Sequence, residues 1–277
     1  MNAQILVCCH KPDIMVTIPP YMPIQVGSAL ASALLPIAGD DTGDNISHKN
    51  PSYCELTGVY WAWKNLSNTD IVGICHYRRY FDFHHQVGFP HAFLSEDQFD
   101  NTDFSIPQKV LKSVSKGRIV VACARYLRES VEENYCFSHE SSDYRVLRSI
   151  VEEDEPANVQ RAWRRVMHRG VKFHPYNMFI MRRADFEDYC SWLFPLLEKV
   201  EVRLKNTDAR DTYQRRVFGF MAERLLGVWI AANGKRTIER PVICFNNLST
   251  GKKANQGYLL YKASGWLKKV GLTLLRI

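Results

Sequence analysis

The chain has 277 residues, of which 46% are hydrophobic, 23% are charged and 12% are aromatic. This is an ordinary globular composition with room for one large α/β domain or two small ones, and no repeat or low-complexity tract interrupts it. The net charge of +7 favours an anionic partner: a phosphorylated substrate, a nucleotide diphosphate, an acidic membrane surface or nucleic acid.

We expect neither a membrane span nor an export signal. No apolar run approaches the ~20 residues that a membrane span needs. The chain does not open with the basic and apolar regions of a signal peptide. The eight cysteines form no CxxC pair, which argues against a zinc ribbon. We therefore expect a reduced, cytoplasmic protein without structural disulfides.

The first expected element is a strand at residues 4–9, which His10 and Lys11 follow directly. Nucleotide-binding α/β domains often begin in this way, although neither a GxGxxG fingerprint nor a P-loop is present. Residues 18–23 indicate an extended, proline-stiffened loop, and residues 24–38 indicate a short helix or a buried loop.

The most turn-rich stretch, residues 39–51, contains Asp44 and Asn45. It is either an exposed polar loop or a loop that recognises a base, ribose or sugar through carboxylates and amides. The following residues 52–66 have aromatic side chains at helical spacing, and Ser52 and Glu55 have the spacing of a capping box. They predict an amphipathic helix.

Residues 71–82, with the sequence IVGICHYRRYFD, combine a buried strand with a basic ending. The apolar run ends at Cys75, and His76, Tyr77, Arg78 and Arg79 follow it without a turn signal. Ligands of open α/β sheets bind outside the carboxyl ends of the strands, and guanidinium groups there suit phosphate. The alternative is a strand that surfaces into a solvated basic loop.

The next segment, residues 84–107, lacks periodicity and is expected to be a long connection or lid. Its histidines invite a metal hypothesis, but their spacing matches no motif and favours neutral surface residues. Further along, the patterns predict a helix at 109–116, a strand at 118–124, a partly helical stretch at 130–151 and helices at 159–168 and 182–200.

Two later stretches carry polar groups suited to chemistry. His174 and Asn177 stand just before an apolar strand at 178–181, where they could bind hydroxyl groups of an acceptor. Residues 210–231 predict a largely apolar helix that contains Glu223. A carboxylate on such a helix needs a partner, for which Arg215, Arg216 and Arg224 are available, or has a raised pKa. Glu223 is therefore either part of a structural ion pair or a general base.

The tail, residues 258–277, has four basic residues, no acidic residue and several aromatic ones. This pattern favours a segment that lies in a membrane interface, and a C-terminal helix packed on the domain is the alternative. We expect a domain at residues 1–250 and a basic aromatic tail at residues 251–277.

Several motifs occur together and in order: VCCHK, GDNIS followed by YCELTGVYWAWKN, CHYRRYF, HPYNMFIM and QRRVFGFMAERLLGVWI. In this combination the chain resembles bacterial capsular and exopolysaccharide biosynthesis proteins, long known as a domain of unknown function and regarded as glycosyltransferases. The resemblance spans roughly residues 4–245. It implies a GT-A-like nucleotide-sugar transferase: a single α/β domain with a Rossmann-like mixed sheet flanked by helices. UDP-galactofuranose is a candidate donor, because some relatives look like galactofuranosyltransferases.

The chain departs from ordinary GT-A enzymes at the end of the central strand. Those enzymes usually carry an Asp-x-Asp metal motif there, whereas this chain has His76 to Arg79. The arginines could neutralise the diphosphate leaving group in place of part of a metal's role. A Mn²⁺ or Mg²⁺ ion held by Asp82 or His76 is the alternative.

We expect transfer of a sugar from a nucleotide diphosphate to a lipid-linked or oligosaccharide acceptor at the inner membrane face, with inversion. In this scheme Glu223 is the general base, and Asn177, His174 and Arg224 bind the acceptor. The rivals are a phosphotransferase or nucleotidyltransferase and a non-enzymatic protein that binds an anionic ligand. Donor binding is assigned to His10, Lys11, Asp44, Asn45, His76, Tyr77, Arg78 and Arg79.

Overall fold

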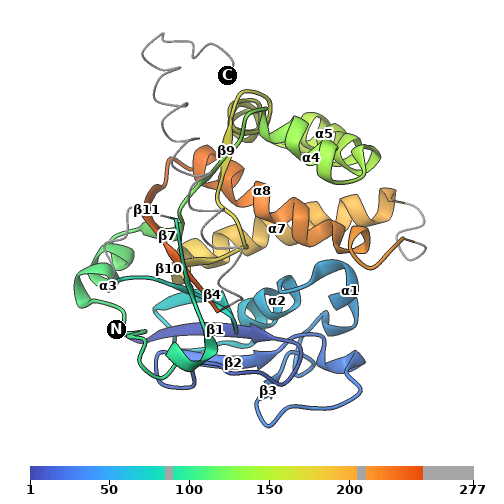
Figure 1. The fold of residues 1–277 in the computed structure, drawn as a ribbon. Helices are drawn as coiled ribbons and strands as arrows, with labels where there is room; N and C mark the ends of the chain where they lie inside the picture. Colours follow the sequence, from blue (N-terminus) through green and yellow to red (C-terminus); the bar gives the residue numbers. More distant parts are fainter. Residues whose placement is uncertain (85–89, 205–209, 246–277) are drawn as a thin grey trace, which may run out of the picture.

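A mixed sheet runs through the centre of the computed structural model, which describes residues 1–84, 90–204 and 210–245 (Figure 1). In spatial order its main path consists of β11 (Arg236–Arg240), β7 (Arg118–Ala122), β10 (Phe179–Arg182), β4 (Ile71–His76), β1 (Ala3–Cys9), β2 (Tyr21–Gln25) and β3 (Ala38–Gly39). Strand β10 is antiparallel to β4 and β7, and the other neighbours on this path are parallel. The carboxyl ends of β2, β1, β4 and β7 therefore meet the amino end of β10 at one edge.

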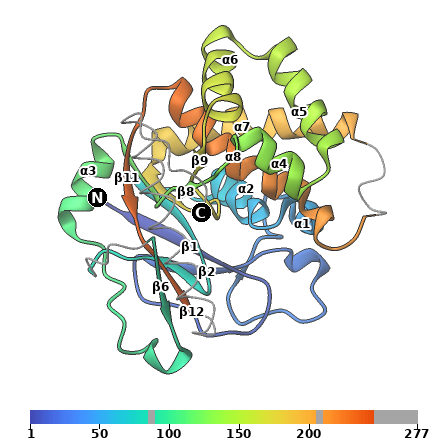
Figure 2. The ribbon, with the colours of Figure 1, turned by 45° about the horizontal axis from the view of Figure 1, so that its top comes forward.

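Three further strands extend the sheet beyond β4. The chain reverses after β4 and enters β5 (Arg79–Phe81), where His76 pairs with Arg79. Strand β5 pairs with β12 (Val242–Phe245), which in turn pairs with β6 (His91–Leu94), and Figure 2 shows β6 and β12 side by side. A separate small sheet pairs β8 (Arg125–Tyr126) with β9 (Lys172–Phe173).

Helices cover both faces of the sheet. One face carries α1 (Asn50–Tyr53), α2 (Leu56–Asn65), α7 (Arg183–Arg203) and α8 (Val217–Ala232), and the other carries α3 (Gln108–Ser115). A further helical layer packs on α8, away from the sheet (Figures 1 and 2). It consists of α4 (Val131–Ser138), α5 (Ser141–Asp154), α6 (Ala157–Trp163) and the π-helical turn η4 (Arg164–His168). The short 3₁₀ turns are η1 (Ser28–Leu30), η2 (Ser47–Lys49), η3 (Glu96–Gln98) and η6 (Gln214–Arg216).

The core forms because successive side chains of a strand point to opposite faces. In β1, Leu6 and Cys8 pack into the cluster under α2, α7 and α8, whereas Ile5 and Val7 pack into the cluster that α3 covers. Each fully buried side chain of this kind contributes about 1.5–3 kcal/mol. A continuous apolar run such as that of β1 is therefore what a strand covered on both faces requires.

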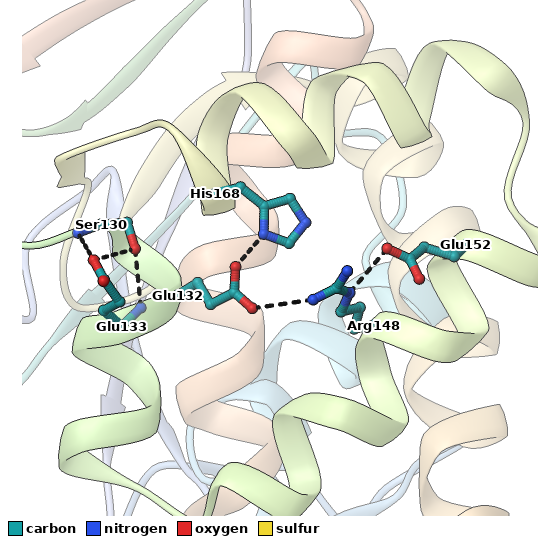
Figure 3. Close-up of polar contacts among 6 residues, drawn as sticks. All are labelled: Ser130, Glu132, Glu133, Arg148, Glu152 and His168. Atoms are coloured by element: carbon teal, nitrogen blue, oxygen red, sulfur yellow. Dashed lines mark hydrogen bonds and ion pairs between the residues drawn. The ribbon is translucent and has the colours of Figure 1, made fainter.

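Polar contacts fasten the helical layer together. In Figure 3 the carboxylate of Glu132, on α4, lies between His168 of η4 and Arg148 of α5. It hydrogen-bonds the ring of His168, and its other oxygen lies 3.5 Å from a guanidinium nitrogen of Arg148. At the start of α4, Ser130 and Glu133 form a capping box. The Glu132 contacts hold α4 in place relative to α5 and η4, and the capping box fixes where α4 begins.

Asp185, in the first turn of α7, is fully buried and binds two cations. Its carboxylate accepts hydrogen bonds from Arg182 at 2.8 Å and from Lys235 at 2.6 Å. We expect Asp185→Asn to lower the free energy of unfolding by about 1.5–3 kcal/mol, since it removes the charge-assisted hydrogen bonds of a buried carboxylate. Urea unfolding at pH 7 measures the difference.

The same carboxylate makes stability depend on pH. Burial alone would raise the pKa of Asp185, but the hydrogen bonds from Arg182 and Lys235 outweigh burial and hold the pKa below its usual 3.8. The stabilisation is therefore complete above pH 3.8 and is lost as the pH falls below that value. The Asn variant should lack this acid-dependent component, and equal acid sensitivity in both proteins would contradict the account.

The predicted α/β class, with a mixed sheet flanked by helices, is confirmed. The expected strands at 4–9, 118–124 and 178–181 correspond to β1, β7 and β10, and the expected helices at 109–116 and 182–200 correspond to α3 and α7. No helix among residues 1–84, 90–204 and 210–245 is both long and apolar enough to cross a membrane. The basic tail at 251–277, and with it the proposed domain boundary, lies outside the described residues.

The structure differs from the predictions in four stretches. Strand β2 begins inside the expected loop at 18–23, where Pro23 hid the strand because proline donates no ladder hydrogen bond. The expected helix at 52–66 is two helices, broken at Cys54 with φ of 52°, and the Ser52 hydroxyl bonds the Lys49 carbonyl instead of capping a helix. A tight reversal follows β4, and the expected connection at 84–107 contains β6 and η3.

Candidate active site

A cavity of about 870 Å³ lies at the sheet edge where the carboxyl ends of β1, β2 and β4 meet. Because β10 is antiparallel to β4, Tyr176 and Asn177, which precede β10, line the same cavity. Helix α8 and the break between α1 and α2 supply further wall residues. The residues that follow or end β1 and β4 and line the cavity are His10, Lys11, His76, Tyr77, Arg78 and Arg79.

Cations outnumber carboxylates in this cavity. Of the described residues that line it, seven are Lys or Arg, whereas two, Glu55 and Glu223, are carboxylates. Burial, reinforced by neighbouring arginines, lowers the pKa of both His91 and His139 to about 4. These histidines are neutral at pH 7, so the positive charge comes from guanidinium and ammonium groups. The excess charge suits a ligand with several negative charges, such as a diphosphate.

The two arginines of the β4–β5 reversal have different partners. Arg78 donates to Asp13 at 3.0 Å and to Glu96 at 2.8 Å, so two carboxylates already offset its charge. The guanidinium of Arg79 lies 4.9 Å from the ring centroid of Tyr176, and no described carboxylate lies within ion-pair distance of it. Arg79 is therefore the better placed of the two to meet an anionic ligand.

Glu223 lies on α8 with 18% of its side chain exposed. One carboxylate oxygen accepts the backbone N–H of Tyr176 at 2.6 Å, and the other accepts Arg224 at 2.5 Å. Burial raises the pKa of Glu223, and Arg224 and the Tyr176 N–H partly oppose this rise. Its partner is thus Arg224, and a carboxylate held in this way, with a raised pKa and a face on the cavity, has the properties of a general base.

The turn before β10 holds this carboxylate in place. Tyr176 has φ of 79° and Asn177 has φ of 51°, in the left-handed region that side chains rarely adopt. The Tyr176 carbonyl accepts a hydrogen bond from Nε2–H of His76 at 2.7 Å. The phenol hydroxyl of Tyr176 hydrogen-bonds Nε2 of His91 at 2.7 Å. The main chain of Tyr176 therefore connects the end of β4 to Glu223 on α8. Strained backbone of this kind is typical of functional sites.

A second carboxylate enters the cavity at the break between α1 and α2. Cys54 takes positive φ, and Glu55 accepts the side-chain amide of Asn177 at 2.6 Å. The same amide donates to the Gly219 carbonyl of α8 at 3.0 Å. Arg216 donates to the sulfur of Cys54 at 3.2 Å, so the break is bound to the start of α8. Asn177 thus has a structural role between the two walls.

Several predicted site residues lie elsewhere. Asp44 accepts the Tyr60 hydroxyl at 3.1 Å, and the Asn45 amide donates to carbonyls of its own loop. The ring of His174 bonds the Ala122 carbonyl at 2.9 Å. These three residues are not among those that line the cavity, whereas the other predicted donor and acceptor residues are.

The predicted metal ligands do not fit a metal site. His76 uses Nε2 to bond the Tyr176 carbonyl, and Asp82 is buried outside the cavity lining, where it accepts the His84 N–H at 3.0 Å. Within the described ranges, no three His, Cys, Asp or Glu side chains come together in a way that could hold a metal ion. Among the described lining residues, the permanently charged cationic groups are those of lysine and arginine.

Sequence reasoning missed several lining residues. Glu55 has capping-box spacing from Ser52, and no local sequence pattern predicts the backbone break at Cys54 that directs its side chain towards the cavity. Arg125 could have been found, since it follows β7 and the carboxyl-end argument applies to it equally. His139 ends α4 and reaches the cavity only through the packing of the helical layer.

Comparisons with known proteins agree with this arrangement. The apo structure of the bifunctional glycosyltransferase WbbM is 27% identical, with a TM-score of 0.79, and the match covers 89% of this chain and 46% of that one. The present chain thus spans about half the length of that protein. No curated protein matches the sequence. Residues 4–234 match the family described as "Domain of unknown function (DUF4422)". The match covers most of the chain, which therefore belongs to this family.

Proposed function

We propose that this protein is a glycosyltransferase that moves a sugar from a nucleotide diphosphate to a saccharide acceptor. The observation that carries the proposal is one cavity with an excess of lysine and arginine, from the strand ends and from α8 and the turn before it, and with a partly buried carboxylate, Glu223, on α8. The likeness to part of a glycosyltransferase supports the same reaction class.

The donor diphosphate would meet the cations at the ends of β1 and β4. Arg79, which is half-buried, is the central group because no described carboxylate pairs with it, and Lys11 adds an exposed charge. Tyr77, whose ring makes an edge-to-face contact with His10 at 5.6 Å, adds an aromatic surface beside them. UDP-galactofuranose is the candidate donor that the family resemblance suggests.

The proposed reaction is a single displacement with inversion. Glu223 takes the proton of an acceptor hydroxyl while the oxygen of that hydroxyl forms a bond to the anomeric carbon. The bond from that carbon to the diphosphate oxygen breaks, and the nucleoside diphosphate leaves with the electron pair. Arg79 and its neighbours offset the negative charge that develops on the leaving oxygen. Arg224 and Asn177 hold the surrounding wall in position.

The biological setting is proposed on sequence grounds. A lipid-linked or oligosaccharide acceptor of capsule, O-antigen or exopolysaccharide synthesis follows from the family resemblance. The basic aromatic tail would hold the enzyme at the inner membrane face.

A thermal-shift panel tests donor binding. A ligand that binds only the folded protein raises its unfolding temperature by mass action. We expect one nucleoside diphosphate and the corresponding nucleotide sugar to raise the unfolding temperature, with and without Mn²⁺. Arg79→Ala should remove most of this rise. The proposal fails if no nucleotide raises the transition in the wild-type protein.

A further inference from the structure

An aromatic surface lies beside α8 in the same cavity. It consists of Tyr213, His139 and Phe220, all of which line the cavity. The rings of His139 and Phe220 stack with centroids 3.9 Å apart and planes at 19°. The Tyr213 ring lies 5.0 Å from that of Phe220 and is 54% exposed. Tyr213 is thus the exposed part of this surface, whereas Phe220 is half-buried against the core and is also contacted by the guanidinium of Arg216, 5.4 Å from its ring centroid.

The segment that carries Tyr213 is fixed on both sides. Before it, Arg210 makes two hydrogen bonds to the buried carboxylate of Asp143 on α5, at 2.5 and 2.8 Å. Asp211 accepts the backbone N–H of Tyr213 at 2.8 Å, and the Gln214 side chain donates to the Ser138 carbonyl at 3.1 Å. An exposed aromatic ring on such a fixed backbone loses little freedom when it binds a ligand.

The aromatic surface lies next to the proposed general base. Phe220 and Glu223 are three residues apart on α8, so their side chains are neighbours on one face of the helix. A sugar ring that contacts Tyr213 and Phe220 would therefore lie in the part of the cavity next to Glu223. Since the base takes a proton from the acceptor, a ring in this position belongs to the acceptor and not to the donor.

We propose that Tyr213, His139 and Phe220 form an acceptor subsite that stacks on the apolar face of a pyranose ring. Sugar C–H groups carry partial positive charge and are attracted to the electron-rich face of an aromatic ring. Hydroxyl and amide groups of Thr212 and Asn134 also line the cavity and suit the polar edge of a sugar. This inference rests on the proposed function and assigns the acceptor side of that site.

Saccharide binding without turnover tests the subsite. The probes are octyl β-glucoside, β-galactoside and α-mannoside, measured by saturation-transfer NMR on the full chain. We expect at least one probe to bind. Tyr213→Ala and Phe220→Ala should each lower the affinity for that probe by about tenfold, because each variant loses one aromatic contact. Phe137→Ala is the matched control, because Phe137 is 92% exposed on α4 and does not line the cavity. It should bind like the wild type.

Nucleotide binding separates this inference from the function on which it rests. We expect Tyr213→Ala to keep the wild-type thermal shift with the nucleoside diphosphate and, in a transfer assay, to raise the acceptor KM alone. Unchanged saccharide binding in Tyr213→Ala, an equal loss in Phe137→Ala, or no binding of any probe to the wild type overturns the subsite. If no nucleotide raises the unfolding temperature of the wild-type protein, the proposed function is overturned instead.

Discussion

Glu223→Gln is expected to lower kcat by about 10²–10⁴-fold, which is the usual contribution of a positioned general base. The amide keeps the shape of the side chain and an oxygen that can accept the Tyr176 N–H, which lies 2.6 Å from the carboxylate in the native protein. The fold and the affinity for a nucleoside diphosphate should therefore be retained, while the free energy of unfolding should fall because the buried guanidinium of Arg224 loses its ion-pair partner. Initial-rate kinetics and nucleotide titration measure the two quantities separately.

The pH profile provides a second signature of the same residue. A general base acts when it is deprotonated, so kcat/KM should rise with pH through the pKa of Glu223. Because burial raises that pKa, the midpoint of the acid limb should lie above the ordinary glutamate value of 4.5. Glu55→Gln is the control, since Glu55 is the other described carboxylate of the cavity. Full activity in Glu223→Gln together with lost activity in Glu55→Gln would assign the base to Glu55.

Arg79→Ala is expected to weaken binding of the nucleoside diphosphate by about 10–100-fold, the loss of one or two charge-assisted hydrogen bonds. Arg78→Ala is the matched comparison on the adjacent residue. Its guanidinium already binds Asp13 and Glu96, so its removal should weaken binding by a smaller factor. Isothermal titration of both variants gives the ratio.

A charge-preserving variant checks the reason for this effect. Arg79→Lys should recover part of the affinity, because the ammonium group retains the charge but lacks the planar fork of donors. If Arg78→Ala weakened binding more than Arg79→Ala, the diphosphate would lie on the Asp13 side of the reversal, and the assignment would be wrong.

The strand-end part of the site could be predicted from the sequence for a general reason. A buried strand such as β4 is visible as an apolar run, and polar residues that follow it reach the edge where ligands bind. His76 to Arg79 and the His10–Lys11 pair were found in this way, and all of them line the cavity. Glu223 was found because a carboxylate on an apolar helix needs an explanation.

The remaining site residues depend on contacts that no local pattern encodes. Glu55 faces the cavity because the backbone breaks at Cys54, which an apolar periodicity does not show. Tyr213 and His139 meet through the packing of α4 on the segment before α8. Asp44 has the chemistry of a ligand-binding residue, yet its hydrogen bond to Tyr60 of α2 belongs to a turn outside the cavity lining.

The most direct test of the account is a product analysis with nucleotide sugars. The full chain is incubated with a panel of UDP-sugars and an octyl hexopyranoside, and the products are resolved by mass spectrometry. The account predicts one nucleoside diphosphate released for each new glycosidic bond, and a loss of both products in Glu223→Gln. Release of a nucleoside monophosphate with a sugar phosphate on the acceptor would instead show phosphotransfer and contradict the proposed function.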